Sequence, residues 1–142
     1  MTDAERTSGP LDIATLDVLA RRAESNPLAD GWAFRPDSMS PRRLELSLDA
    51  DQYPQSVVTV RLDVRWFEGG DYTFHYHESH TEDSWQCRWD RHPKPNEPRT
   101  HLHPPPDAET VEESEINADH HLGILFSVLE RVEARVTDLH HG

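Results

Sequence analysis

The stretch VVTVRLDVRWFEGGDYTFHYH, residues 57–77, decides the fold. In its first half an apolar side chain recurs at every second position, at Val58, Val60, Leu62, Val64 and Trp66. Its second half repeats the pattern at Tyr72, Phe74 and Tyr76. A period of two is typical of a strand with one buried face, and the two glycines between the halves indicate a hairpin. The stretch therefore predicts two antiparallel strands with one apolar and one polar face.

Two loops would match the apolar faces of these strands. A loop of residues 69–71 would set Asp63 opposite His77, whereas a loop of residues 67–71 would set Arg61 opposite His77. Either register leaves the histidines of the second strand on the polar face, because the side-chain period is two.

Three other segments are predicted strands. Leu44, Leu46 and Leu48 alternate with polar residues, and Trp32-Ala33-Phe34 forms a shorter strand. A last strand carries Trp85, Cys87 and Trp89 on its apolar face. Cys87 is thereby buried between two tryptophans, which argues against a role as a nucleophile.

Two amphipathic helices bracket the strands. The first begins at Pro10, with Ser8 and Gly9 as candidate caps. The last is capped by Asp119 and has an apolar stripe formed by Leu122, Leu125, Leu129, Val132, Val136 and Leu139. We predict an α+β fold, in which an antiparallel sheet of four to five strands packs its N-terminal and C-terminal helices on one face.

Length and composition favour a single domain over residues 1–142, with residues 1–9 frayed and residues 92–118 forming a Pro-rich and acidic loop. No apolar run is long enough to span a membrane, and no signal-peptide core follows Met1. One cysteine excludes an internal disulfide framework. We expect a soluble cytoplasmic protein that does not bind a membrane.

The chain is strongly acidic, with 27 Asp and Glu against 14 Lys and Arg, and Lys94 is its only lysine. This balance resembles proteins of salt-accumulating halophilic archaea, where carboxylates keep the surface hydrated and salt screens their repulsion. A GC-rich genome would also favour Arg over Lys, but it does not explain the excess of acids. We predict a haloarchaeal protein whose charge reflects its solvent and not its partner.

Residues 84–106 depart from this balance and carry a net charge of +2. Their charged residues are Arg88, Arg91, Lys94 and Arg99 against Asp90 and Glu97. The segment also contains three of the ten histidines, which makes it the one cationic island in the chain.

The polar sheet face and this segment together form the candidate site. Candidate acid–base residues are His75, His77, Arg88, Asp90, His92, His101 and His103. Candidate substrate-binding residues are Arg61, Arg65, Arg91 and Arg99. Histidine exchanges protons near neutral pH, and arginine holds phosphate or an oxyanion. These residue types suffice for RNA cleavage without a metal or other cofactor, although a solvated face with cross-strand ion pairs would look the same.

The histidines also allow a third interpretation. His75 and His77 share one strand face, and His101 and His103 would do so if their segment is extended. Imidazoles in this arrangement can bind zinc, nickel or copper. Zinc sites more often use Cys or histidines four residues apart, so we predict no metal.

Three motifs resemble the TumE-like toxins of toxin–antitoxin pairs. They are Tyr76-His77, Arg88-Trp89-Asp90-Arg91-His92-Pro93 and His101-Leu102-His103-Pro104. The family has a Tyr-x-Tyr/His strand, an Arg-Trp/Tyr-Asp-Asn-Ala-Pro-His-like turn and a His-rich segment before a C-terminal helix. The likeness runs in order from Val57 to Leu139, and this chain departs from the family turn in reading Asp-Arg-His-Pro.

The resemblance implies a toxin that a co-encoded antitoxin neutralises, typically a helix-turn-helix DNA-binding protein. It carries over Arg88, Asp90, His92, His101 and His103 as site residues, whereas His75 and His77 follow from strand parity alone. We therefore expect the toxin of a type II pair and, from the His and Arg residues of the face, a ribonuclease with RNA as substrate. The alternatives are a non-enzymatic interaction module with a cationic docking loop and a small His-rich metal-binding protein.

Overall fold

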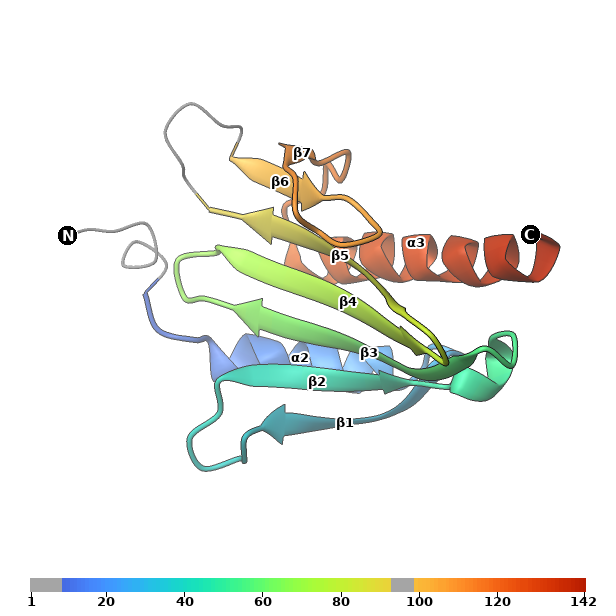
Figure 1. Ribbon diagram of the computed structural model, residues 1–142. Helices are drawn as coiled ribbons and strands as arrows, with labels where there is room; N and C mark the ends of the chain where they lie inside the picture. Colours follow the sequence, from blue (N-terminus) through green and yellow to red (C-terminus); the bar gives the residue numbers. More distant parts are fainter. Residues whose placement is uncertain (1–8, 93–98) are drawn as a thin grey trace.

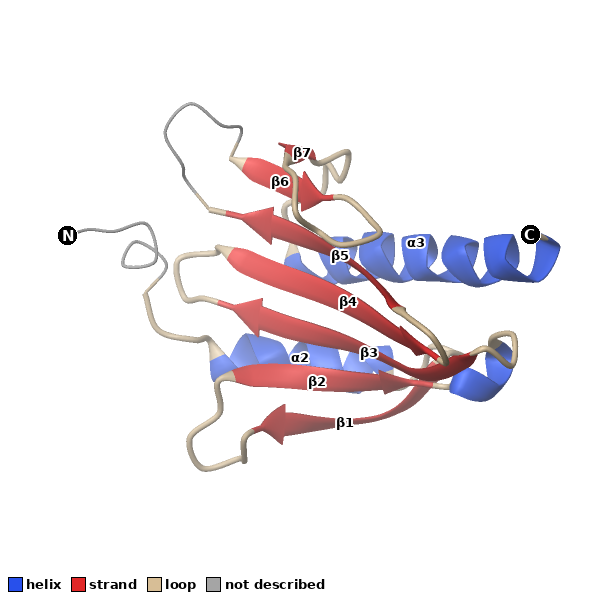
Figure 2. Ribbon diagram, in the orientation of Figure 1, coloured by secondary structure: helices blue, strands red, loops and turns tan. Residues whose placement is uncertain are grey.

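Among residues 9–92 and 99–142, which the computed structural model describes, seven antiparallel strands follow one another across a single sheet in chain order (Figure 1). They are β1 (Ala29–Arg35), β2 (Arg43–Leu48), β3 (Val57–Trp66), β4 (Tyr72–His80), β5 (Ser84–Arg91), β6 (Thr100–His103) and β7 (Glu112–Glu113). The helices α2 (Ile13–Ala23) and α3 (His121–His141) both lie behind the sheet in Figure 2, and a short 3-10 turn, η1 (Ala50–Gln52), follows β2. The predicted α+β class, with two helices on one face, is confirmed.

The predicted count of four to five strands is too low. Strands β6 and β7 both lie in the segment 92–118, which the sequence predicts to be a loop. The four residues of β6 stand between Pro98 and Pro104 and include no proline, so each of them has a backbone N–H for the ladder. The part of this segment at 93–98, like the predicted fraying of residues 1–8, lies outside the described residues.

The β3–β4 hairpin has the longer of the two predicted loops. Arg61 pairs with His77, and the Phe67 N–H donates to the Asp71 carbonyl across the loop at 2.9 Å. At the other end of β3 one prediction is wrong, because Val58 is 54% exposed. A register shift between Val57 and Thr59 turns Val57 into the core in its place.

The predicted caps of both helices are also wrong. Asp12, and not the Ser8–Pro10 segment, caps α2 by accepting from the Thr15 N–H at 3.0 Å. Ser8 lies outside the described residues. His120, and not Asp119, caps α3, because its Nδ1 accepts from the Leu122 N–H. Each cap lies immediately before the first helical residue, where a side-chain acceptor reaches the free N–H groups.

The apolar sides of β2–β5 and the inner faces of α2 and α3 form the core, which includes Cys87 and Trp89. Burial raises the pKa of the Cys87 thiol to about 12, which agrees with the prediction that this thiol is not a nucleophile. No helix in the described ranges is long and apolar enough to cross a membrane.

One carboxylate is buried within this covered side of the sheet. Glu78 is 1% exposed and accepts from the Arg135 Nε and Nη2 atoms at 2.8 and 2.9 Å. It also contacts the Tyr76 hydroxyl and His80 Nε2, both at 2.7 Å, and the Tyr76 hydroxyl lies 2.6 Å from that of Tyr53. Burial alone would raise the pKa of Glu78, but these hydrogen bonds and the charge of Arg135 outweigh it and lower the pKa.

Candidate functional site

The sheet face opposite the helices, hereafter the open face, carries a row of ionisable residues that the strand register brings together. Asp63 on β3 lies opposite His75 on β4, and His75 lies opposite Arg88 on β5. Arg88 in turn lies opposite His103 on β6. Alternation turns the apolar neighbours of these residues toward the helices, so four strands present their polar side chains on one surface.

This surface is hollowed into a pocket of about 410 Å³, the candidate catalytic pocket, hereafter the catalytic pocket. Ten residues line it: Arg43, Arg61, Asp63, Arg65, Thr73, His75, His77, Arg88, Asp90 and His92. Thr73 is paired with Arg65 on one side and with Asp90 on the other, and its side chain is short beside theirs. The longer side chains around it therefore form the walls of the hollow.

Asp63 holds one wall of the pocket. Its carboxylate lies 3.1 Å from Arg61 Nε, 3.4 Å from Arg43 Nε and 3.4 Å from His77 Nε2. Burial alone would raise the pKa of Asp63, but the hydrogen bonds from His77 and Arg61 and the nearby arginine charges lower it overall. Asp63 is thus ionised, and its carboxylate holds the side chains of Arg61, Arg43 and His77 in place.

His75 stands at the centre of the row. Its Nε2 lies 2.7 Å from Gln86 Oε1, and its ring packs on that of His77 with centroids 3.9 Å apart. Burial, followed by the charges of His77 and Arg88, lowers the pKa of His75, although the hydrogen bond to Gln86 opposes this. With Gln86 Oε1 as acceptor, the neutral ring carries its proton on Nε2 and leaves Nδ1 free to take one.

Asp90 holds the other wall and is only 2% exposed. Its Oδ2 accepts from Arg88 Nε at 2.9 Å and lies 3.0 Å from His103 Nε2 and 3.9 Å from His92 Nε2. His103 Nε2 is also 3.0 Å from Arg88 Nη2. Because a guanidinium only donates, His103 Nε2 accepts from Arg88 when it carries no proton and donates to Asp90 Oδ2 when it carries one.

His101 lies behind this wall. It is paired with Asp90 and is completely buried, with its ring centroid 5.1 Å from that of His92 and 6.4 Å from that of His103. Neither His101 nor His103 lines the catalytic pocket. The structure therefore places both histidines in a supporting layer next to Asp90 and His92.

The four predicted substrate-binding arginines separate into two pairs. Arg61 and Arg65 line the catalytic pocket, and within the described residues Arg65 has no carboxylate partner. Arg91 points to the helix side, where its guanidinium lies over Tyr72 and donates to the Gly70 carbonyl. Arg99 extends outward toward Asp71, at 3.5 Å, and its side chain is 63% exposed. The structure does not bring the second pair to the pocket.

A family model described as "Toxin TumE" matches residues 17–136. The chain belongs to the TumE toxin family. The match covers the sheet, most of both helices and all the pocket-lining residues. No curated protein and no solved structure matches the chain. A toxin role follows from membership of the TumE family, and the recognition made from the three sequence motifs is confirmed at the level of the family.

Sequence reasoning missed two pocket-lining residues of this TumE-family chain and one residue beside the pocket. Arg43 lines the pocket from β2 and Thr73 from β4, and Gln86 contacts His75 next to it. All three have polar-face parity in their strands, so alternation alone assigns them to the open face. Their contacts with the site also depend on the register between strands, which the sequence does not fix.

The metal interpretation has no support in the geometry that the structure describes. Within residues 9–92 and 99–142, no group of three or more His, Cys, Asp or Glu side chains is arranged to hold a metal ion. The side chains that line the pocket can transfer protons through imidazoles and bind anions through guanidinium groups.

Proposed function

We propose that this chain is the toxin of a type II toxin–antitoxin pair and that it cleaves RNA in the catalytic pocket without a metal ion. The observation that carries the proposal is the pairing of His75, whose pKa is lowered, with arginines in a solvent-accessible pocket of about 410 Å³. A neutral imidazole beside guanidinium groups supplies both a base and a phosphate-binding site.

Phosphate binding falls to the arginines of the pocket. Arg65 has no carboxylate partner among the described residues, so its guanidinium is free for a phosphate. Its Nε donates to the Arg42 carbonyl at 3.2 Å, which orients the side chain. Arg61 lies on the same strand as Arg65, and it shares the Asp63 carboxylate with Arg43, so two arginines next to a single carboxylate add positive charge to this wall. These charges would stabilise the phosphorane that forms during cleavage.

His75 would be the base. Its Nδ1 takes the proton of the 2′-hydroxyl, the 2′-oxygen then forms a bond to phosphorus, and the bond from phosphorus to the 5′-oxygen breaks. His77 would act through His75, because it packs on that ring and contacts Asp63.

His92 would be the acid that protonates the leaving 5′-oxygen. Its Nε2 lies 3.9 Å from Asp90 Oδ2, close enough for the carboxylate to attract the charged ring. Arg88 and His103 hold Asp90 from the other side, so they would position the acid without touching RNA. The products are a 2′,3′-cyclic phosphate and a 5′-hydroxyl.

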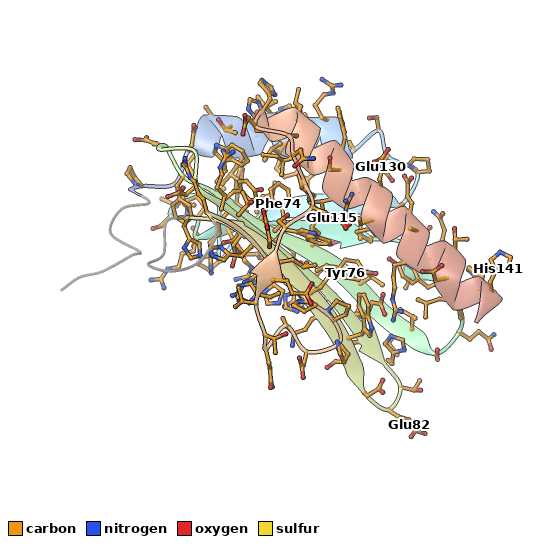
Figure 3. The ribbon with its side chains drawn as sticks, turned by 90° about the horizontal axis from the view of Figure 1, so that it is seen from above. Phe74, Tyr76, Glu82, Glu115, Glu130 and His141 are labelled. Carbon is orange, nitrogen blue, oxygen red and sulfur yellow. The ribbon has the colours of Figure 1, made fainter. Side chains whose placement is uncertain are left out.

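The direct test is incubation of the purified protein with a labelled oligoribonucleotide in excess EDTA, followed by analysis of the termini. Cleavage with a cyclic phosphate end supports the proposal, and it should be lost in His75→Gln. His141→Gln is the matched control, because His141 is exposed at the end of α3, away from the pocket (Figure 3). Intact RNA under these conditions contradicts the ribonuclease and favours a non-enzymatic interaction module.

The antitoxin half of the proposal rests on the TumE family. We propose that the partner is encoded next to this chain and is a helix-turn-helix DNA-binding protein, and that both act in the cytoplasm. Co-expression with the neighbouring gene should restore growth that the toxin alone arrests. If the neighbouring gene encodes no such protein, or if growth stays arrested, the pairing is wrong.

We also infer a halophilic, and specifically haloarchaeal, origin from the 27 acidic residues and the single lysine. Salt screens repulsion among surface carboxylates, so multimolar KCl should raise the unfolding temperature well above its value in dilute buffer. An unfolding temperature that does not rise with KCl contradicts this origin.

A further inference from the structure

The connections at one end of the sheet are all acidic. Residues 49–56, 81–83 and 104–111 link β2 to β3, β4 to β5 and β6 to β7, and they contain no lysine or arginine. Their acidic residues are Asp49, Asp51, Glu82, Asp83, Asp107 and Glu109. We call this end the acidic end, and Glu82 projects from its β4–β5 turn in Figure 3.

The opposite end of the open face carries arginines where strands end or begin. Arg35 closes β1 and is paired with Arg43, the first residue of β2. Arg65 lies at the same end of β3, paired with Thr73 near the start of β4. We call this the arginine end. Arg43, Arg65 and His92 line the catalytic pocket from this end, so the pocket opens toward positive charge.

A second hollow, of about 510 Å³, adjoins the catalytic pocket on the other side, and Arg61 lines both. Its carboxylates come from Asp30, Glu45, Asp49 and Asp51. Glu45 is paired with Arg35 and Arg43, but the other three have no cationic partner within the residues that the structure describes. An RNA strand leaving the pocket in this direction would pass over unneutralised carboxylates.

The arginine end therefore attracts a polyanion, whereas the acidic end repels it. Each nucleotide brings one phosphate charge, which arginines attract and unpaired carboxylates repel. The second hollow shares a wall with the pocket, so the next phosphates would approach its carboxylates within the screening length of about 10 Å at 0.1 M salt. At 1 M salt this length falls to about 3 Å, so in the salt of a halophile only phosphates in direct contact with the hollow are repelled, and the effect is largest at low salt.

We propose that the catalytic pocket takes single-stranded RNA whose chain continues only over the arginine end, so that the cleaved bond lies close to one terminus of the strand. This inference rests on the proposed ribonuclease function and adds the substrate class, a strand terminus and not an internal segment. The acidic hollow limits how many nucleotides fit on the far side of the cleaved bond.

The test uses three DNA oligonucleotides of equal length that each contain a single ribonucleotide. A mechanism that needs a 2′-hydroxyl can cleave only the bond that follows the ribonucleotide. The ribonucleotide is placed near the 5′ end in one oligonucleotide, at the centre in the second and near the 3′ end in the third. One of the two terminal placements should be cleaved about tenfold faster than the central one, at the lowest salt that keeps the protein folded.

Charge-neutral variants then locate the cause. The triple variant Asp30→Asn, Asp49→Asn and Asp51→Asn removes the three unpaired carboxylates of the second hollow and should bring the central rate close to the terminal one. The matched control, Glu130→Gln, Glu133→Gln and Asp138→Asn, removes the same formal charge from the exposed side of α3 and should leave the preference unchanged.

The possible failures are distinguishable. Equal rates at all three placements overturn the terminal preference and leave the ribonuclease intact. A preference that survives in the triple variant, or disappears in the control, overturns the role of the acidic hollow. No cleavage of any oligonucleotide overturns the proposed function, and the terminal preference with it.

Discussion

Two carboxylates are buried on opposite sides of the same sheet, and their surroundings differ. Glu78, on the helix side, receives hydrogen bonds from the Arg135 guanidinium, the Tyr76 hydroxyl and His80. Asp90, on the open face, concentrates its contacts on Oδ2, and its buried Oδ1 has no hydrogen-bond partner among the described residues. Both are almost inaccessible, but of the two only Asp90 lines the catalytic pocket.

The difference separates a structural role from a functional one. A buried charge whose partners are complete stabilises its surroundings, and removing it leaves those partners unpaired. A buried charge with an unused acceptor, beside histidines that open to solvent, can still change its contacts when a ligand or proton arrives. We therefore expect substitutions on the two sides of the sheet to affect different properties.

The largest effect is expected at His75. His75→Gln keeps a polar side chain of similar reach beside Gln86 but removes the base, so RNA cleavage should fall about 10³-fold. The unfolding midpoint should change little, because the ring lies on the open face. Initial rates and a denaturant titration of the same preparation measure both, and a variant that keeps its cleavage rate contradicts the assignment.

The next largest effect is expected at Glu78. Glu78→Gln leaves the Arg135 guanidinium without its counter-ion and should lower the free energy of unfolding by about 3 kcal/mol. The cleavage rate of the folded fraction should stay near that of the wild type. Loss of activity in the folded fraction would mean that the helix side also serves the site.

A smaller effect is expected at Thr73, which lines the pocket. Thr73→Phe should fill the hollow without removing a charge and raise the KM for RNA about tenfold. Thr137→Phe is the matched control, since Thr137 is exposed on α3 and lines neither the catalytic pocket nor the second hollow. An unchanged KM in Thr73→Phe, or an equal rise in the control, argues against binding in this pocket.

The smallest expected effect is a shift in pH dependence. Because burial lowers the pKa of His75 below 6.5, the ring stays neutral as the pH falls through 6.5 and gains its proton only at lower pH. The acid limb of kcat/KM should therefore have its midpoint below 6.5. A midpoint at or above that value would mean that another group is the base.

Alternation made much of the open face predictable from the sequence. It assigned His75, His77, Arg88 and Asp90 to one face, because side chains of a strand alternate regardless of what surrounds them. The same rule places Arg91 on the helix side with Cys87 and Trp89, so the sequence contained the signal against its assignment as a substrate-binding residue.

Features that depend on contacts distant in sequence were not predictable. Glu78 has the parity of the buried face, but its main partner, Arg135, is 57 residues away on α3. The contact of Arg43 with Asp63 depends on the β2–β3 register. The exposure of Val58 depends on a register shift that no residue pattern in β3 marks. In each case the sequence shows which face of its strand a residue occupies, but it does not show which distant residue that side chain contacts.

The comparison of the two carboxylates is tested most directly by the RNA cleavage rate of Asp90→Asn. This rate is divided by the folded fraction of the variant and compared with the rate of Glu78→Gln, obtained in the same way. Asparagine keeps the size of the side chain and removes the charge that holds Arg88, His92 and His103. We predict a rate about 10²-fold below the wild type, with an unfolding midpoint reduced less than that of Glu78→Gln. A wild-type rate in Asp90→Asn, with stability lost as in Glu78→Gln, would contradict the assignment of the open face as the active site.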